Sequence, residues 1–179
     1  DALPPAQGMT QPLPDKADAY TWCKAPRYGG HVVETGALAR QMVAGHPLIR
    51  EWVAAKGGSV TARVLARLLE LALVVPEMER WAKALTPGEP WCHHAELPDE
   101  GSGVGLVEAA RGSLGHWLSV RHRRIANYQI IAPTTWNFSP RDAGGVPGAL
   151  EQALAGMAVD SDDPMPVLVQ HVVRSFDPC

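Results

Sequence analysis

The clearest pattern of apolar residues lies between Thr61 and Leu85, where they recur at the three- and four-residue spacing of a helical face. We therefore predict a long helix there, with Pro76 kinking it or dividing it in two. A second helical pattern runs from Thr35 to about Ala55. Gly45 and Pro47 break it in the middle, because neither residue continues a helix easily.

After Gly115 the pattern changes from helical to extended. Two short apolar runs, Trp117–Val120 and Ile125–Ile131, stand on either side of the charged stretch Arg121–Arg124. Short β-branched runs separated by polar residues are typical of paired antiparallel strands. The sequence therefore predicts a β-hairpin over residues 115–132.

The remaining segments are rich in Pro and Gly. Residues 88–103 are predicted to form a loop, and residues 133–147 an irregular segment. A short helix is expected over Gly148–Leu154, and a short helix or strand over Pro166–Val173. Residues 1–19, with four prolines, predict an extended arm. Together these elements predict an α+β fold that is predominantly α-helical with a β-hairpin.

Composition and charge narrow the class of protein. Of the 179 residues, 46% are hydrophobic and 20% are charged, as in an ordinary globular domain. The net charge of −3 provides no broad basic surface, so we expect no nucleic-acid partner. The basic stretch Arg121–Arg124 is interpreted as a solvated turn. No apolar run approaches the roughly 18 residues that a membrane span needs.

The three cysteines, Cys23, Cys92 and Cys179, are odd in number and form no C-x-x-C pair. This argues against a disulfide framework and favours a reducing compartment, so we expect a cytoplasmic location. A complete zinc or iron–sulfur site cannot be assembled from these cysteines alone. His93 and His94 follow Cys92 at no zinc-binding spacing, and we interpret them as part of a polar loop.

Four stretches of the chain resemble one known family. They are Lys24–Tyr28, Glu108–Trp117, Ile125–Asp142 with its Asn-Tyr-Gln and Ala-Pro-Thr-Thr-Trp-Asn runs, and the terminal Ser175–Cys179. In this order and at these separations they resemble the C-terminal part of the large subunit of nickel–iron hydrogenases. The resemblance covers residues 20–179 and implies the C-terminal portion of that large-subunit fold, without its N-terminal half.

The resemblance implies a Ni–Fe centre with CO and cyanide ligands, held by four cysteine thiolates. Cys179 corresponds to a nickel ligand, and the other three thiolates are not in this sequence. Soft thiolates suit nickel and low-spin iron. A thiolate bound only to nickel can also accept a proton when H2 is split. The alternative for Cys179 is a buried cysteine without a metal.

By the same resemblance, Arg111 corresponds to an arginine above the open side of the metal pair. Its permanently charged guanidinium could polarise the substrate or help to take its proton. Arg111 and Cys179 are therefore the predicted catalytic residues. Ala110 stands where the family often has Pro, which leaves the backbone geometry before Arg111 open. The alternative role for Arg111 is a surface ion pair.

Four further positions follow from the resemblance. Pro133 and Thr134 correspond to the segment that hydrogen-bonds a cyanide ligand, and Asp177 to a carboxylate beside the metals. Thr134 and Asp177 could instead cap turns. The backbone carbonyl of Ile130 corresponds to a magnesium ligand that some family members use, so Mg is a second candidate metal.

Three functions remain open at this level. The first is H2 oxidation, with the N-terminal half of the large subunit and an iron–sulfur small subunit as partners and with membrane association only through them. The second is H2 sensing that signals to a kinase. Ala110, Arg174 and the Thr21–Cys23 run favour this sensing branch or the group 2 uptake branch. The third is a metal-free structural relative of the quinone-reductase type.

Overall fold

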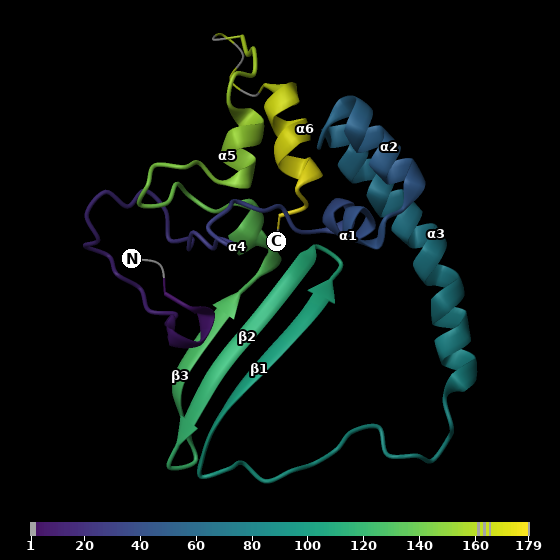
Figure 1. The fold of residues 1–179 in the computed structure, drawn as a ribbon, viewed down its shortest axis with the longest axis vertical. Helices are drawn as coiled ribbons and strands as arrows, with labels where there is room; N and C mark the ends of the chain where they lie inside the picture. The colour runs from purple at the N-terminus through teal and green to yellow at the C-terminus, as the bar shows by residue number, and fades with distance from the viewer. Residues whose placement is uncertain (1–2, 161, 163, 165, 179) are drawn as a thin grey trace.

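The computed structural model describes residues 3–160, 162, 164 and 166–178. Figure 1 shows helices gathered at one end and a long three-stranded sheet extending away from them. The two helices predicted between Thr35 and Ala55 are α1 (Ala37–Ala44) and α2 (Pro47–Lys56). Gly45 adopts a left-handed conformation with φ 78°, and this lets the His46 N–H reach the Gln41 carbonyl at 3.0 Å and end α1.

The long predicted helix is α3 (Val60–Ala84). Its first turn is capped by Ser59, whose hydroxyl accepts a hydrogen bond from the Ala62 N–H at 3.3 Å. The predicted division at Pro76 is wrong, because α3 continues through this residue. The ring removes one N–H donor, and the carbonyl it would have paired with, on Ala72, lies at an exposed position where water can reach it.

The predicted hairpin is formed by β2 (Gly112–Arg121) and β3 (Arg124–Ile131). His122 and Arg123 join them with φ values of 50° and 59°, as a two-residue turn between twisted strands requires. This confirms the hairpin and places Arg121–Arg124 at its turn.

The prediction of a loop over residues 88–103 is wrong at its end, where β1 (Glu100–Ala109) begins. β1 pairs with β2 along its whole length, from Glu100 opposite Arg121 to Ala109 opposite Gly112, so the strand order is β1-β2-β3. Four of its ten residues are Gly or Ala, which have little strand preference of their own. Pairing with β2, rather than local propensity, makes this strand.

Three short helices follow the sheet. α4 (Pro133–Asn137) corrects the prediction of a wholly irregular segment over residues 133–147. Pro133 stands at its first position, where the ring costs no hydrogen bond. α5 (Ala149–Leu154) is the predicted helix over Gly148–Leu154. α6 (Val167–Ser175) resolves the open choice between helix and strand.

The described part of the N-terminal arm contains one short 3-10 helix, η1 (Pro5–Gln7). Beyond it, the arm lies along β3. The Gly8 carbonyl accepts a hydrogen bond from Asn127 Nδ2 at 3.0 Å, and the Thr10 N–H donates to the Tyr128 carbonyl at 3.4 Å.

The main apolar core lies where α1, α2 and the first half of α3 meet. Its buried members are Ala37, Leu38, Ile49, Ala62 and Ala66. The second half of α3 extends away from the other helices in Figure 1, and its apolar side chains are exposed. None of the helices in the described part of the chain combines the length and apolar character needed to cross a bilayer.

Candidate functional site

One small pocket brings together two of the stretches singled out in the sequence. It lies between the turn that joins β1 to β2 and the end of α6, with the start of α1 and one face of α3 as its other walls. Ala110 and Arg111 line it from the turn, and Asp177 lines it from the residues after α6. Ala110 and Arg111 therefore meet Asp177 here, although Asp177 lies more than 60 positions later in sequence.

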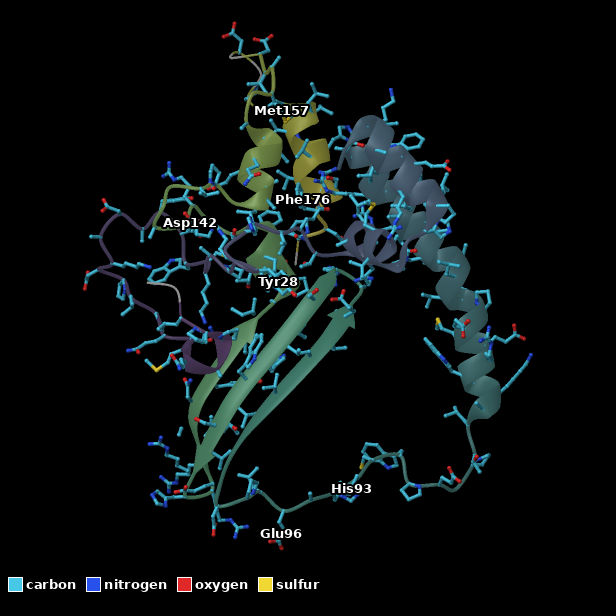
Figure 2. The ribbon with its side chains drawn as sticks, in the orientation of Figure 1. Tyr28, His93, Glu96, Asp142, Met157 and Phe176 are labelled. Carbon is cyan, nitrogen blue, oxygen red and sulfur yellow. The ribbon has the colours of Figure 1, made fainter. Side chains whose placement is uncertain are left out.

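Two arginines of α3 hold the end of α6 at this pocket. Arg67 donates to the Ser175 carbonyl at 2.7 Å, and Arg63 donates to the Ser175 hydroxyl at 3.2 Å. The Arg63 guanidinium also lies 3.7 Å from the centre of the Phe176 ring. Figure 2 shows Phe176 at the end of α6. These contacts set the direction in which the chain leaves α6 towards Asp177.

Arg63 is buried, and it pairs with Glu34 through two hydrogen bonds of 2.8 Å. Sequence reasoning missed this pair, because the periodicity that predicts the helix concerns its apolar positions and not Arg63 or Arg67. Their four-residue spacing, which places two guanidiniums on one face, was the available signal.

The turn that carries Arg111 packs closely against the segment before α1. Gly112 has φ 134°, and a Cβ there would lie 2.4 Å from the Thr35 hydroxyl and 2.9 Å from the Gly36 nitrogen. Only glycine fits this position without moving one of the two segments. Arg111 itself is exposed at the pocket, and it forms no ion pair with another described residue.

Thr35 connects this pocket to α4. Its backbone N–H and carbonyl both bond to the buried Asn137 side chain at 2.9 Å. Its hydroxyl oxygen is buried at the pocket wall and has no hydrogen-bond partner among the described residues. A buried hydroxyl without a partner is costly, so this atom is suited to a group that enters the pocket.

Pro133 and Thr134 form the first turn of α4 and do not line the pocket. Pro133 is buried, and the Thr134 carbonyl accepts a hydrogen bond from the Phe138 N–H at 2.8 Å. Nearby, the half-buried Cys23 thiol lies 3.8 Å from the Thr135 carbonyl, and burial raises the pKa of this thiol. The structure links α4 to the pocket through Asn137, and the predicted roles of Pro133 and Thr134 stay predictions.

Ile130 lies on β3, where its N–H donates to the Thr10 hydroxyl at 3.4 Å. The neighbouring Gln129 is buried and accepts a hydrogen bond from Lys24, which also donates to Thr10 at 2.9 Å. Burial lowers the pKa of Lys24. A magnesium ion needs hard oxygen ligands, and this cluster offers a carbonyl, an amide and a hydroxyl but no carboxylate. Mg at Ile130 therefore stays a prediction.

The predicted nickel ligand, Cys179, lies outside the described residues. Within the described part of the chain, no three His, Cys, Asp or Glu side chains are grouped closely enough to hold a metal ion. Cys92 lies 3.1 Å from the Nε2 atom of His94 in the segment before β1. Figure 2 shows His93 in the same segment, on the strand-free stretch between α3 and β1 and away from the pocket.

The whole chain, residues 1–179, matches the family model described as nickel-dependent hydrogenase. This chain belongs to the nickel-dependent hydrogenase family. Among its relatives is the periplasmic [NiFeSe] hydrogenase large subunit of Desulfomicrobium baculatum, which is 38% identical over 188 residues. That alignment covers 96% of this chain and 36% of the relative. The uptake hydrogenase large subunit of Azotobacter chroococcum mcd 1 is 36% identical, over 92% of this chain and 32% of that subunit.

Solved hydrogenase structures share the fold. The Ni-Fe-Se hydrogenase from D. vulgaris Hildenborough in the reduced state superposes with a TM-score of 0.88 and 37% identity, over 99% of this chain and 40% of the other. The chain thus spans about a third to two fifths of the hydrogenase large subunits it matches. The predicted family and fold class are confirmed. The names of these relatives do not support the hydrogen-sensing branch, and the cytoplasmic location stays a prediction.

The residues that line the pocket fit a nickel–iron centre whose remaining thiolate ligands come from outside this chain. The pocket wall combines the unpartnered Thr35 hydroxyl, the exposed Arg111 guanidinium and two carboxylates, those of Glu34 and Asp177. Guanidinium and hydroxyl groups donate hydrogen bonds to anionic ligands. Groups of this kind surround a metal centre and orient its ligands.

Proposed function

We propose that this chain forms one wall of the Ni–Fe site of a hydrogenase large subunit that oxidises H2 to protons and electrons. The observation that carries the proposal is that Arg111 and Asp177 line the same pocket. Asp177 is two residues before Cys179 in sequence. Family membership supports the nickel site, and the names of the uptake relatives support the direction of the reaction.

The bound centre would supply the two-electron chemistry of H2 splitting. Arg111 would place a permanent positive charge at the open face of the pocket, where it can polarise H2 and help to take its proton. Cys179 would be a nickel thiolate that accepts the proton from the split substrate.

The other predicted residues would surround the centre. Thr134, after Pro133 in the first turn of α4, would donate to a cyanide ligand of the iron. Asp177 would orient ligands from the far side of the pocket. Ala110 precedes Arg111 with no side chain beyond Cβ, so it leaves the approach to the pocket open. Ile130 would offer its carbonyl to a magnesium ion.

The partners follow from what this chain exposes. α3 carries exposed apolar side chains over its second half, including Leu71, Val75, Met78 and Trp81. A helix that is apolar on most sides is typical of the interior of a larger protein. We propose that the N-terminal half of the large subunit covers this face and supplies the missing thiolates. An iron–sulfur small subunit would take up the electrons.

The test compares Arg111→Lys with Arg121→Lys in the assembled hydrogenase. Both change an exposed arginine, but Arg111 lies in the turn before β2 and Arg121 lies at the far end of β2. We expect Arg111→Lys to lower kcat for H2 oxidation by about a hundredfold or more with nickel and iron content unchanged, and Arg121→Lys to leave kcat unchanged. Cys179→Ser should abolish metal incorporation, measured by metal analysis and by the infrared bands of bound CO and cyanide. Full turnover in Arg111→Lys would overturn the proposed role.

A further inference from the structure

The turn at the pocket is very short. Only Ala110 and Arg111 join β1 to β2. Ala109 and Gly112, on either side of them, form the last pair of the β1–β2 ladder. The ladder fixes the two strands relative to each other, but it does not fix where the tip of the hairpin points relative to the helices. Another contact must hold the tip at the pocket.

Arg40, on α1, makes that contact. Its Nη1 donates to the Ala109 carbonyl at 2.7 Å, and its Nη2 donates to the Ala110 carbonyl at 3.0 Å. Nη1 also donates to Glu108 at 3.0 Å, at the end of β1. One guanidinium thus binds three consecutive residues that lead directly into Arg111.

The same guanidinium also forms hydrogen bonds with a residue of α3. Its Nε and Nη2 donate to the two carboxylate oxygens of Glu70 at 2.8 and 2.6 Å. Gln41 donates a further hydrogen bond to Glu70 at 3.1 Å. All five N–H donors of Arg40 therefore have an acceptor, and a fork of this kind fixes the plane of the guanidinium.

We propose that Arg40, oriented by Glu70, is a positioning residue that holds the hairpin turn so that Arg111 stays at the open face of the pocket. The proposal rests on the proposed function of Arg111. Lysine cannot replace Arg40, because an ammonium has three donors around one atom and cannot bind two carbonyls and two carboxylates together. The acceptors on the turn are backbone carbonyls, so the contact sets the course of the chain itself.

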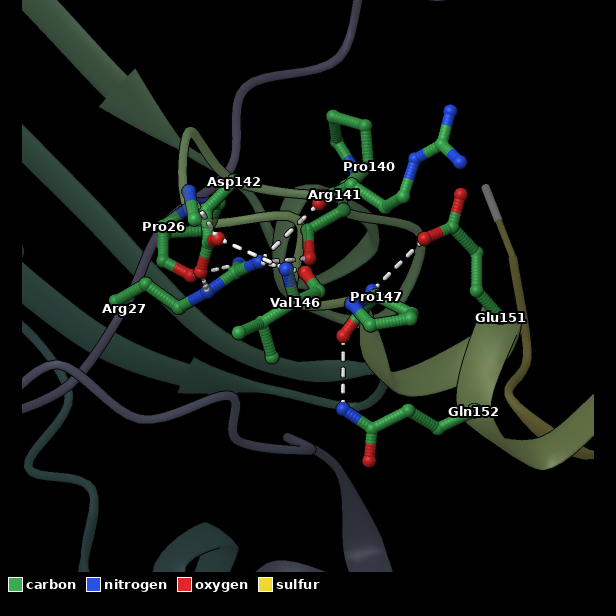
Figure 3. Close-up of polar contacts among 12 residues, drawn as sticks. Pro26, Arg27, Pro140, Arg141, Asp142, Val146, Pro147, Glu151 and Gln152 are labelled. Atoms are coloured by element: carbon green, nitrogen blue, oxygen red, sulfur yellow. Dashed lines mark hydrogen bonds and ion pairs between the residues drawn. The ribbon is translucent and has the colours of Figure 1, made fainter.

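Arg27 offers a matched control. It too uses five N–H donors, to Asp142 at 3.0 Å, to Ser139 at 3.1 Å and to three backbone carbonyls. Figure 3 shows that these contacts hold the loop between α4 and α5. Loss of the Arg27 fork should disturb that loop and leave the Arg111 turn in place.

The experiment is a pair of double-mutant cycles in the assembled hydrogenase. One combines Arg40→Lys with Arg111→Lys, and the other combines Arg27→Lys with Arg111→Lys. We expect Arg40→Lys to lower kcat by about tenfold to a hundredfold, and the double variant to be no slower than Arg111→Lys alone. In the Arg27 cycle the two effects should multiply. Multiplying effects in the Arg40 cycle, or full turnover in Arg40→Lys, would overturn the proposal.

A second measurement is independent of turnover. Hydrogen exchange at the backbone amides of Arg111 and Gly112 should be faster in Arg40→Lys than in the parent assembly, and unchanged in Arg27→Lys. If Arg111→Lys keeps full turnover while Arg40→Lys still loosens the turn, the proposed function has failed and the positioning contact stands. Unchanged exchange in Arg40→Lys overturns the positioning role. Should Arg40→Lys fail to assemble, Glu70→Gln makes the same comparison with one charge removed.

Discussion

The two halves of α3 are both rich in apolar residues, but their surroundings are very different. Residues 60–69 pack against α1 and α2, and Ala62 and Ala66 are fully buried there. Residues 70–84 are also rich in apolar side chains, but Leu71 is 61% exposed and Trp81 is 60% exposed. The helix is continuous, so the difference comes from what covers it and not from its own preference for helix.

The comparison shows where the stability of this chain resides. Burial of apolar area stabilises only the half of α3 that has neighbours within the chain. The other half gains nothing from its leucines, valines and tryptophan until another surface covers them. Removing an apolar side chain should therefore cost much more stability at the packed half than at the exposed half.

The largest effect is expected in the packed half. Ile49→Ala removes a fully buried side chain that contacts the first half of α3, so it should lower the free energy of unfolding by about 2–5 kcal/mol. Leu71→Ala removes a similar side chain from the exposed half and should change that free energy by less than about 0.5 kcal/mol. Chemical denaturation of the chain measures both, and equal effects would show that the two halves are not packed differently.

An intermediate effect is expected at Glu70, where the packed half gives way to the exposed half. Burial alone would raise the pKa of Glu70, but hydrogen bonds from Arg40 and Gln41 hold it below its usual value. A lowered pKa in the folded state stabilises the chain above the ordinary pKa, and this stabilisation is lost as the pH falls through the lowered value. Glu70→Gln should cost about 1.5–3 kcal/mol at neutral pH.

The difference between Glu70→Gln and the parent chain should therefore shrink as the pH is lowered below about 4. Denaturation curves recorded between neutral and acidic pH measure it. Glu79→Gln is the control, because Glu79 pairs only with Lys83 among the described residues, on the exposed part of α3. A pH-independent difference for Glu70→Gln would exclude the linkage.

The smallest effect on stability is expected at Trp81. Trp81→Gln replaces an exposed aromatic side chain with a good helix former, so the unfolding free energy should change by less than about 0.5 kcal/mol. Its effect should appear instead in association, as weaker binding of the chain to the rest of the large subunit. A clear loss of stability in the chain alone would mean that Trp81 already has a partner within it.

Sequence reasoning succeeded where the spacing of apolar residues and the positions of Gly, Pro and turn residues indicate the same element. The break at Gly45, the hairpin with its turn at Arg121–Arg124 and the helix after Gly148 are set by local chemistry, and the structure contains all three. It failed at β1, which is a strand because β2 pairs with it. At Pro76 only the division of the helix is wrong, because a single missing donor on an exposed face does not end a long helix.

The site was only partly accessible from the sequence. The family motifs directed attention to Arg111 and Asp177, and the structure brings them to one pocket. Arg40 and Arg63 lie at polar positions of the predicted helices, and Glu34 lies just before the first of these helices. Their partners are 29 to 112 positions away in sequence. Contacts over such separations depend on tertiary packing, which no local pattern encodes.

β1 is the outer strand of the sheet, and this has a consequence for how the chain behaves in solution. Its free side presents a row of backbone donors and acceptors, and its charged residues, Glu100 and Glu108, stand only near its two ends. Val104, Leu106 and Val107 between them are exposed. Such an edge is a template on which another strand can add. Concentrated solutions of the chain should therefore self-associate through β1. The substitution Leu106→Lys should prevent this self-association.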